Sequence, residues 1–213
     1  MTSLASGATE PTGLGPEVGV GPYPQPWPDD PRLDRTLLAE GDQRNVVDRY
    51  RYWSIDAIVA DLDERRHPFH VAIENWTSDL NIGTVVRNAN AFLAASVRIV
   101  GNRKWNRRGA MVTDRYQHVA HHDDVDALLA WAMAEDLPVV GIDNLPGATP
   151  LERTDLPERC VLLFGQEGPG LSVDAREACA VVCSITQVGS TRSINAGVAS
   201  GIAMHTWLRQ HAL

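Results

Sequence analysis

The alternation of apolar runs with helix-like segments constrains the fold of this chain more than any other feature. Near-continuous apolar runs are typical of parallel strands buried on both faces, with the intervening helices covering those faces. We therefore predict an α/β fold with a mostly parallel sheet and helices on both faces. The expected strands are 69–75 (FHVAIEN), 97–101 (VRIVG), 137–143 (LPVVGID), 160–165 (CVLLFG) and 181–185 (VVCSI), and the expected helices are 81–95, 123–136, 172–180 and 193–211.

The N-terminal part differs from the rest in composition. Residues 1–31 hold seven of the 13 prolines and five glycines, and few side chains there could build a core. We expect residues 1–50 to be a Pro/Gly-rich tail that is largely disordered or draped over the surface, and residues 51–213 to be one folded domain. A short helix fits residues 32–40, and Ser54 is placed to begin a further helix over 54–66.

Several function classes are disfavoured by composition. The sequence has no apolar run long enough to span a bilayer and no signal-peptide pattern, so we expect a cytoplasmic protein without membrane contact. The net charge of −8 argues against nucleic-acid binding by the whole surface. One local exception exists, because the segment from Arg98 to Arg115 carries six basic residues and only one acid, Asp114.

Ligands of open parallel sheets bind beyond the carboxyl ends of the strands, and three segments there carry unusual residues. The first contains Asn81 and Arg87, the second is the glycine-rich turn 165–170, and the third contains Ser193 and Asn195. Taken singly, each has a structural explanation, namely helix capping, a solvated surface charge or a tight turn. Against capping alone stands the helix after Ser193, whose Gly197 and Gly201 cost about 1 kcal/mol each relative to alanine and indicate close approach to a neighbour.

Together, these segments resemble a known family. Asn81-x5-Arg87, the stretch FGQEGPGLS (164–172) and the pattern I-x3-G-x3-SIN (185–195) resemble the three motifs of the TrmH (SpoU) family of SPOUT RNA methyltransferases. The resemblance covers about residues 69–211. It implies the SPOUT fold with a C-terminal deep trefoil knot, a homodimer, and S-adenosylmethionine as cofactor. The implied reaction is methylation of a ribose 2′-hydroxyl in structured RNA. The compactness of the chain slightly favours tRNA over rRNA, because a small dimer suffices to grip one stem-loop.

The resemblance also assigns residues to the site. Arg87 is the implied catalytic residue that orients the 2′-hydroxyl. The pattern departs from the family at Thr186 and Gln187, where Pro-Met is usual, and at Ile194, where leucine is usual. The implied catalytic set is Arg87, Asn81, Glu167, Ser193 and Asn195, and the implied cofactor-binding set is Asp143, Asn144, Gly165, Glu167, Gly168, Ile185, Gln187, Ser193, Ile194 and Asn195.

The basic segment fits RNA docking beside Arg87, although a plain charged loop is the alternative. Its arginines suit phosphates and its tryptophan suits base stacking, so we expect RNA contacts from Arg103, Lys104, Trp105, Arg107 and Arg108. We expect no metal, because the His/Asp group in 118–124 has irregular spacing. Two other functions remain open: a non-catalytic RNA-binding or assembly protein with a knotted fold, and a nucleotide-binding α/β enzyme unrelated to methylation.

Overall fold

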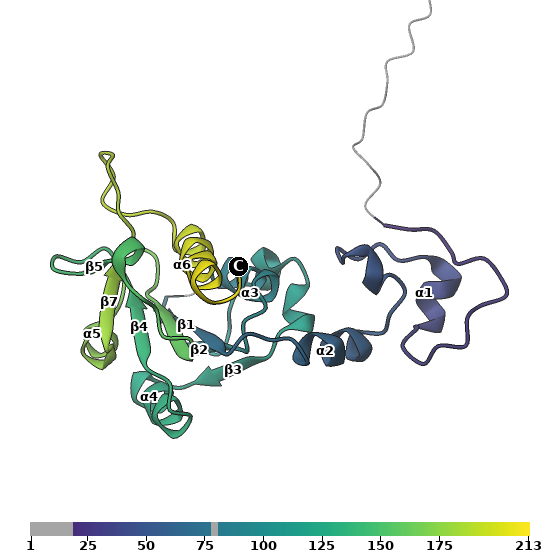
Figure 1. The fold of residues 1–213 in the computed structure, drawn as a ribbon, viewed down its shortest axis with the longest axis horizontal. Helices are drawn as coiled ribbons and strands as arrows, with labels where there is room; N and C mark the ends of the chain where they lie inside the picture. The colour runs from purple at the N-terminus through teal and green to yellow at the C-terminus, as the bar shows by residue number, and fades with distance from the viewer. Residues whose placement is uncertain (1–18, 78–80) are drawn as a thin grey trace, which may run out of the picture. The chain divides into compact units, whose positions relative to one another are not determined.

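The computed structural model describes residues 19–77 and 81–213. These residues form two compact units that divide between Ile58 and Val59, and Figure 1 shows the elements of each. Unit 1 precedes the division and unit 2 follows it. The first 18 residues of the predicted tail lie outside the described part of the chain, and the predicted boundary between residues 50 and 51 stays a prediction.

Unit 2 is built on a seven-stranded sheet in the order β3-β2-β1-β6-β4-β7-β5. Every strand pairing in this order is parallel, which confirms the predicted mostly parallel α/β class. The strands are β1 (Phe69–Asn75), β2 (Val97–Gly101), β3 (Val119–His122), β4 (Val139–Ile142), β5 (Thr149–Pro150), β6 (Cys160–Phe164) and β7 (Val181–Ser184).

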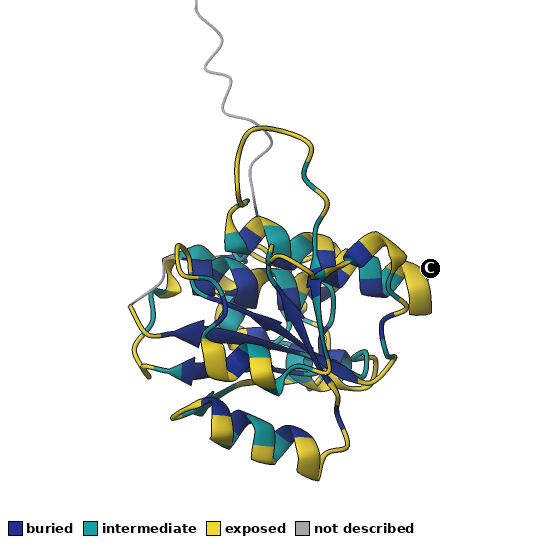
Figure 2. Ribbon diagram, turned by 90° about the vertical axis from the view of Figure 1, so that its left-hand side faces the viewer, coloured by how far each residue is buried: buried dark blue, intermediate teal, exposed yellow. Residues whose placement is uncertain are grey.

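Two apolar clusters cover the two faces of the sheet, so helices pack on both, as predicted. One cluster joins side chains of α3 (Asn81–Ala91) and α6 (Ala196–His211) to the sheet. The other joins α4 (Val125–Ala134) and α5 (Val173–Ala178) to the opposite face. In Figure 2 the strands carry mostly buried residues and the exposed residues lie on the outer sides of the helices. Burial on both faces explains why β6 is a continuous apolar run and why most of β1 is apolar.

The structure corrects two features of the expected element list. Residues 119–122, which lie outside every expected strand, form the edge strand β3, whose side chains are exposed or only partly buried, and β5 is a further short strand at the other edge. The last helix begins at Ala196 rather than at Ser193. Its start is set by Asn195, whose side chain accepts a hydrogen bond from the backbone N–H of Val198 at 3.2 Å.

The two glycines of α6 have different environments. A methyl group on Gly197 would lie 2.7 Å from Thr84 Cγ2 of α3, so this glycine permits the close contact between the two helices. A methyl group on Gly201 would meet only the Asn88 side chain, at 3.4 Å, which is ordinary van der Waals contact. Close packing within the chain therefore explains Gly197 and leaves Gly201 unexplained.

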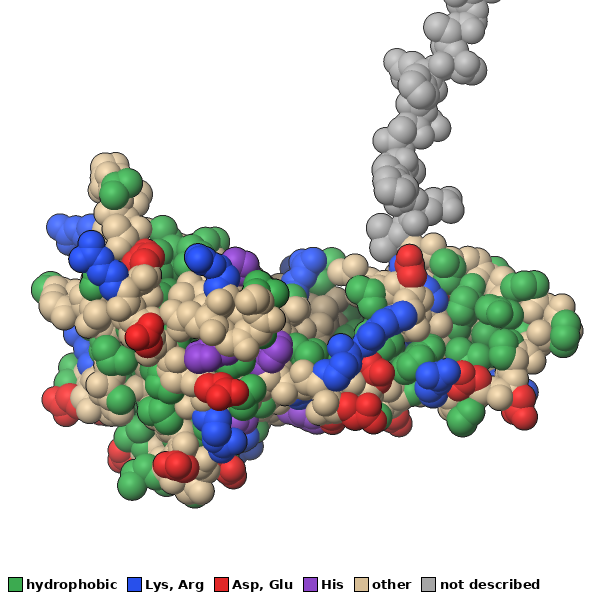
Figure 3. Space-filling model, in the orientation of Figure 1, with side chains coloured by type: hydrophobic (Ala, Val, Ile, Leu, Met, Phe, Trp, Pro, Cys, Tyr) green, Lys and Arg blue, Asp and Glu red, His purple; other side chains and the backbone are tan. Residues whose placement is uncertain are grey.

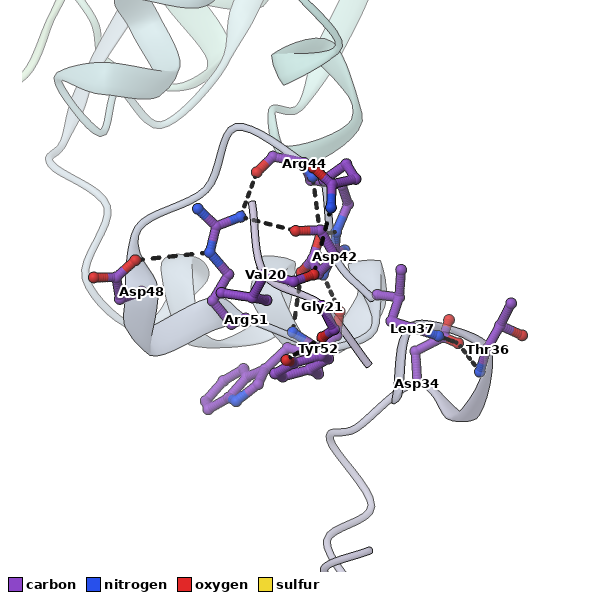
Figure 4. Close-up of polar contacts among 12 residues, drawn as sticks. Val20, Gly21, Asp34, Thr36, Leu37, Asp42, Arg44, Asp48, Arg51 and Tyr52 are labelled. Carbon is purple, nitrogen blue, oxygen red and sulfur yellow. Dashed lines mark hydrogen bonds and ion pairs between the residues drawn. The ribbon is translucent and has the colours of Figure 1, made fainter. Parts of the chain in front are cut away.

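Unit 1 is organised around one buried carboxylate (Figure 4). Asp42 is fully buried and follows α1 (Arg35–Glu40), while the 3-10 helix η1 (Asp48–Tyr50) and the helix α2 (Ile55–Asp63), which crosses the division, come later. Arg44 donates to Asp42 through Nε at 2.9 Å and Nη2 at 2.7 Å, and the Tyr52 backbone N–H donates at 3.0 Å. Burial raises the pKa of Asp42, but the hydrogen bonds from Arg44 and Tyr52 outweigh it and lower the pKa to about 2.

Replacing Asp42 with asparagine should destabilise unit 1 selectively. Removing one member of a buried pair costs about 3–5 kcal/mol because the other charge is left uncompensated. Hydrogen exchange measured by mass spectrometry should show faster exchange across residues 19–58 and unchanged protection of β1 and β6. The control is Asp48→Asn, because Asp48 has a fully exposed side chain and lies 3.7 Å from Arg51. Equal protection in the two variants would contradict the prediction.

The same carboxylate gives a pH dependence with a defined sign. The pKa of Asp42 is depressed in the folded state, from the ordinary 3.8 to about 2. Its stabilising contribution is therefore complete above pH 3.8 and is lost as the pH falls from 3.8 toward 2. The Asp42→Asn variant should lose this part of the acid sensitivity of unit 1.

Two further observations concern the described part of the chain. None of its helices combines the length and apolar character that a membrane span requires. Its three cysteines are free thiols, and burial raises the pKa of Cys160 to about 12. This thiol is therefore inert at neutral pH and packs as a small apolar side chain.

Candidate functional site

A cavity of about 380 Å³ lies where β4, β6 and β7 end. Three segments form its wall: the end of β4, the glycine-rich turn after β6, and the segment between β7 and α6, which extends away from the sheet in Figure 1. All ten residues predicted to bind the cofactor line this cavity, namely Asp143, Asn144, Gly165, Glu167, Gly168, Ile185, Gln187, Ser193, Ile194 and Asn195.

The glycine-rich turn is folded tightly upon itself. A methyl group on Gly165 would overlap the backbone of Gly170 and Leu171, and Gly170 has a φ of 73°, a left-handed conformation that favours glycine. The carboxylate of Asp143 accepts from the backbone N–H of Leu171 at 2.9 Å and from that of Asn144 at 2.7 Å. Asp143 therefore fastens the turn to the end of β4.

Asn144 connects the same end of β4 to the third segment. Its Nδ2 donates to the backbone carbonyl of Arg192 at 2.7 Å. Arg192 also lines the cavity and directly precedes Ser193. The two polar residues after β4 therefore hold the other two cavity segments in place from one point.

Three predicted catalytic residues form one hydrogen-bonded chain. Asn81, at the start of α3, donates through Nδ2 to Glu167 Oε2 at 2.6 Å and accepts at Oδ1 from Asn195 Nδ2 at 2.7 Å. Asn81 is buried, while Glu167 and Asn195 lie on the cavity wall. The side chains of three segments that are far apart in sequence are thereby fixed relative to one another.

Arg87 lies apart from this chain. It is exposed on α3 and does not line the cavity, and no hydrogen bond or ion pair joins it to the rest of the described structure. The next residue, Asn88, donates to the Gly197 carbonyl at 2.8 Å and to Ser200 Oγ at 2.9 Å. These bonds fix α3 against α6 and leave the guanidinium of Arg87 available to a bound molecule.

The basic segment is held against the start of α3. Asn75 at the end of β1 donates to the carbonyls of Asn102 and Lys104 at 2.6 and 2.9 Å. A methyl group on Gly83 would lie 2.8 Å from Gly109 Cα, so two glycines allow the backbones to touch. The segment is thus fixed beside the helix that carries Arg87.

The five predicted RNA contacts are not equivalent in the structure. Trp105 is half-buried and packs on the apolar core, with the Arg107 guanidinium 5.4 Å from its ring centroid. Arg103 and Arg107 pair with Asp123 and Asp114, each at 3.3 Å. All the cationic members are exposed: Arg103, Lys104, Arg107 and Arg108.

The sequence analysis missed part of the site. Glu74, fully buried at the end of β1, accepts from the Ser172 backbone N–H and from Trp76 Nε1, each at 2.8 Å, and so supports the end of the glycine-rich turn. An acid inside an apolar strand was the available signal. The missed cavity residues are Ile142, Leu145, Phe164, Gln166, Pro169, Gly170, Arg192, Ala196 and Ala199.

Within residues 19–77 and 81–213, no group of three or more His, Cys, Asp or Glu is arranged to hold a metal ion. In the sequence group from His118 to Asp124, Asp124 instead caps α4 by accepting from the Ala127 backbone N–H at 2.8 Å. His118 lies 2.8 Å from Asp63. These residues therefore have structural contacts of their own.

Known proteins are similar to this chain over the region that holds the cavity and the basic segment. A model of the SpoU rRNA Methylase family matches residues 68–205. A Mycolicibacterium vanbaalenii protein named as an uncharacterized tRNA/rRNA methyltransferase is 33% identical over 189 residues, which are 84% of this chain and 59% of that protein. The chain therefore spans less than two thirds of the length of this relative.

Two solved structures are similar in fold. The structure described as the A. aeolicus TrmH/SpoU tRNA modifying enzyme matches with a TM-score of 0.65 and 20% identity, over 73% of this chain and 81% of that one. The SpoU methyltransferase AviRb from Streptomyces viridochromogenes, in complex with AdoMet, matches with a TM-score of 0.62 and 25% identity, over 70% of this chain and 60% of that one.

Proposed function

The chain belongs to the SpoU rRNA methylase family, and on that premise we propose that it is an S-adenosylmethionine-dependent methyltransferase acting on a ribose 2′-hydroxyl of structured RNA. One observation carries the proposal: a cavity at the carboxyl ends of parallel strands is lined by residues 164–170 of the second family motif and by Ile185, Ser193, Ile194 and Asn195 of the third, while the first motif reaches it through Asn81. AviRb, in its structure with AdoMet, shares the fold.

The residues of the cavity fit this cofactor. Gly165 and Gly168 offer backbone without side chains, and Gln187 contributes a buried acceptor, Oε1, that has no partner in the described structure. When bound, the sulfonium of S-adenosylmethionine supplies an activated methyl group. We propose that Gly165, Gly168, Ile185 and Gln187 hold the adenosine, with Asp143, Asn144, Ser193 and Ile194 completing the wall.

Arg87 is proposed to position the target nucleotide. A guanidinium stays protonated at neutral pH, so it donates hydrogen bonds rather than accepting a proton. It is suited to hold a phosphate bidentately and to orient the neighbouring 2′-hydroxyl. The chain of Asn195, Asn81 and Glu167 would fix the cavity wall beside it. The exposed cations of the basic segment would bind the RNA backbone, and this binding should weaken with salt.

Membership of the family also supports proposals on the chain topology, the domain bounds, the localisation and the oligomeric state. We propose that the C-terminal segment is threaded as a trefoil knot, that residues 51–213 form the SPOUT domain after an N-terminal tail, that the protein is cytoplasmic, and that it acts as a homodimer. Support for the dimer comes from α6, where Val198 and Ile202 are 55% and 39% exposed and where packing within the chain does not require a glycine at Gly201. Figure 3 shows hydrophobic side chains at the surface in the region of α6.

Replacing Ile202 with glutamate should convert the proposed dimer to a monomer. A charge placed in an apolar interface must be desolvated without a partner, which disfavours association. Sedimentation velocity should show a dimer for the unmodified chain and a monomer for this variant. Val173→Glu is the control, because Val173 is 63% exposed on α5, away from α6. Dimers in both variants would place the interface elsewhere.

The substrate class is tested by methyl transfer. Labelled S-adenosylmethionine is incubated with the protein and with separated tRNA and rRNA pools from a strain that lacks the gene, and the labelled nucleosides are then identified. We expect a 2′-O-methylated nucleoside in one pool, with tRNA favoured. No incorporation into either pool and no cofactor binding would favour the non-catalytic RNA-binding function instead.

A further inference from the structure

Trp76 is an exposed tryptophan that is held in a fixed position. It directly follows β1 and is 38% exposed. Its indole Nε1 donates to the carboxylate of Glu74, and its backbone carbonyl accepts from Asn102 Nδ2, each at 2.8 Å. Glu74 is itself fully buried. Hydrogen bonds to the ring and to the backbone therefore keep a large aromatic side chain in one place at the surface.

The ring of Trp76 lies against the backbone of Gly101. A methyl group on Gly101 would lie 2.7 Å from Cε3 and 2.8 Å from Cζ3 of the indole. Gly101 ends β2 and is the parallel partner of Asn75, the residue before Trp76. Because glycine lets the indole approach the chain this closely, one side of the ring is supported by backbone while part of the ring stays exposed.

The other tryptophans in the described part of unit 2 already have partners for their rings. Trp105 and Trp131 each have an arginine guanidinium over the ring, 5.4 and 3.8 Å from the ring centroid. Trp207 is buried against Phe69, with 4.5 Å between the ring centroids. Within residues 59–77 and 81–213, neither an aromatic ring nor a guanidinium stacks on Trp76. Its exposed surface is therefore available to a flat ligand.

The residues on either side of Trp76 connect it to the basic segment and to the cavity. Asn75 donates to the backbone carbonyl of Lys104 at 2.9 Å, and Lys104 is exposed. Thr77 donates through Oγ1 to Gln166 Oε1 at 2.8 Å, and Gln166 lines the cavity. The indole is thus placed where a strand bound by the basic segment would reach the proposed methyl-transfer site.

We propose that Trp76 stacks on an unpaired base of the RNA substrate, next to the nucleotide that is methylated. Every base has a π-face, so a fixed indole binds single-stranded bases with little regard to sequence. RNA is favoured over a protein partner because the neighbouring cations Arg103 and Lys104 are exposed and suit the phosphates of the same strand. Glu74 acts as a positioning residue, because it holds the indole nitrogen. This inference rests on the proposed function, and it assigns to Trp76 the stacking that we expected of Trp105, whose ring packs on the apolar core.

RNA binding by the full chain, measured over a range of salt concentrations, tests the assignment. The probes are end-labelled tRNA and rRNA pools, followed by fluorescence anisotropy. Trp76→Leu keeps an apolar side chain against Gly101 but removes the flat ring. Its affinity for the bound pool should be about tenfold lower at every salt concentration. Stacking releases no counterions, so the dependence of log affinity on log salt should keep its slope, whereas Lys104→Ala should reduce that slope by about 1.

Two further variants separate stacking from a merely structural effect. Trp76→Phe keeps an aromatic face but loses the bond to Glu74, and its affinity for RNA should stay within about threefold of the unmodified chain. Trp131→Leu is the matched control, because it makes the same replacement on α4, which packs on the sheet away from the basic segment. This variant should bind RNA like the unmodified chain.

The outcomes distinguish this inference from the proposed function. Equal RNA affinity in Trp76→Leu and Trp76→Phe would overturn the assignment. A change from dimer to monomer in Trp76→Leu, seen by sedimentation velocity, would overturn it too, because the ring would then contact a second copy of the chain. Failure of the unmodified chain to bind either pool would overturn both the assignment and the proposed RNA substrate. A tenfold loss in Trp76→Leu alone, in a chain that transfers no methyl group, would support stacking by Trp76 and overturn the proposed reaction.

Discussion

Replacing Arg87 with alanine should lower the rate of methyl transfer by about 10³-fold, the upper range for loss of one preorganised donor. Affinity for S-adenosylmethionine should stay within a few-fold of the unmodified chain. The structure separates the two effects, because Arg87 is exposed on α3 and stands outside the cavity wall. Single-turnover transfer to the modified RNA pool measures the first quantity, and calorimetric titration with the cofactor measures the second.

The choice of replacement tests how Arg87 acts. Lysine keeps the charge but cannot form the planar, bidentate contact, so Arg87→Lys should recover only a small part of the lost rate. Arg209→Ala is the control, because Arg209 is an exposed arginine near the end of the neighbouring helix α6. A near-normal rate in Arg87→Ala would remove Arg87 from the catalytic set, whereas loss of cofactor binding would indicate a structural defect of α3.

The sheet could be predicted where burial imposes an unbroken apolar run. β1 and β6 are buried along almost their whole length. β6 is apolar throughout, and β1 is apolar apart from His70, Glu74 and Asn75. β3 was missed because it lies at the edge of the sheet, where its residues are exposed or only partly buried and two histidines are tolerated. Residues 119–122 therefore carry no burial pattern that distinguishes an edge strand from a loop.

The location of the site could be predicted, but its internal contacts could not. The carboxyl ends of parallel strands meet at one edge of a sheet, so Gly165 and Asn195 were expected to lie near each other. The bond between Asn81 and Glu167 joins residues 86 positions apart and depends on β6 lying directly beside β1. Strand order is a property of the whole chain that local periodicity does not encode.

The sequence analysis did not identify Glu74 and Asn75 as supporting residues, because their partners also depend on the fold of the whole chain. Glu74 and Asn75 end β1 and serve two different segments: Glu74 bonds to Ser172 after the glycine-rich turn, and Asn75 bonds to the carbonyl of Lys104 in the basic segment. Adjacent residues of a strand point to opposite faces. The end of β1 therefore holds both the glycine-rich turn of the proposed cofactor site and the basic segment proposed to bind RNA. A carboxylate and an amide at the end of an apolar strand gave no indication of which segments they would meet.

Replacing Gly165 with alanine should weaken cofactor binding strongly with little effect on the rest of the sheet. The added methyl group would overlap the backbone of Gly170 and Leu171, and backbone held by the Asp143 carboxylate has no low-cost way to move aside. We expect affinity for S-adenosylmethionine to fall by about 10²-fold or more, equivalent to at least about 2.7 kcal/mol of binding free energy. Overpacking should also lower the free energy of unfolding by about 1–3 kcal/mol.

The matched control is Gly21→Ala in unit 1, outside the three motif segments. A methyl group there meets nothing within 4 Å, so this variant should bind the cofactor like the unmodified chain. Calorimetric titration gives the affinities, and hydrogen exchange of β1 and β6 shows that the sheet remains folded. Normal cofactor affinity in Gly165→Ala would mean that the cofactor does not need the tight turn, and the cavity would then lose its assignment. Loss of affinity in Gly165→Ala alone would tie binding to the contact between Gly165 and Gly170, because both variants add the same methyl group.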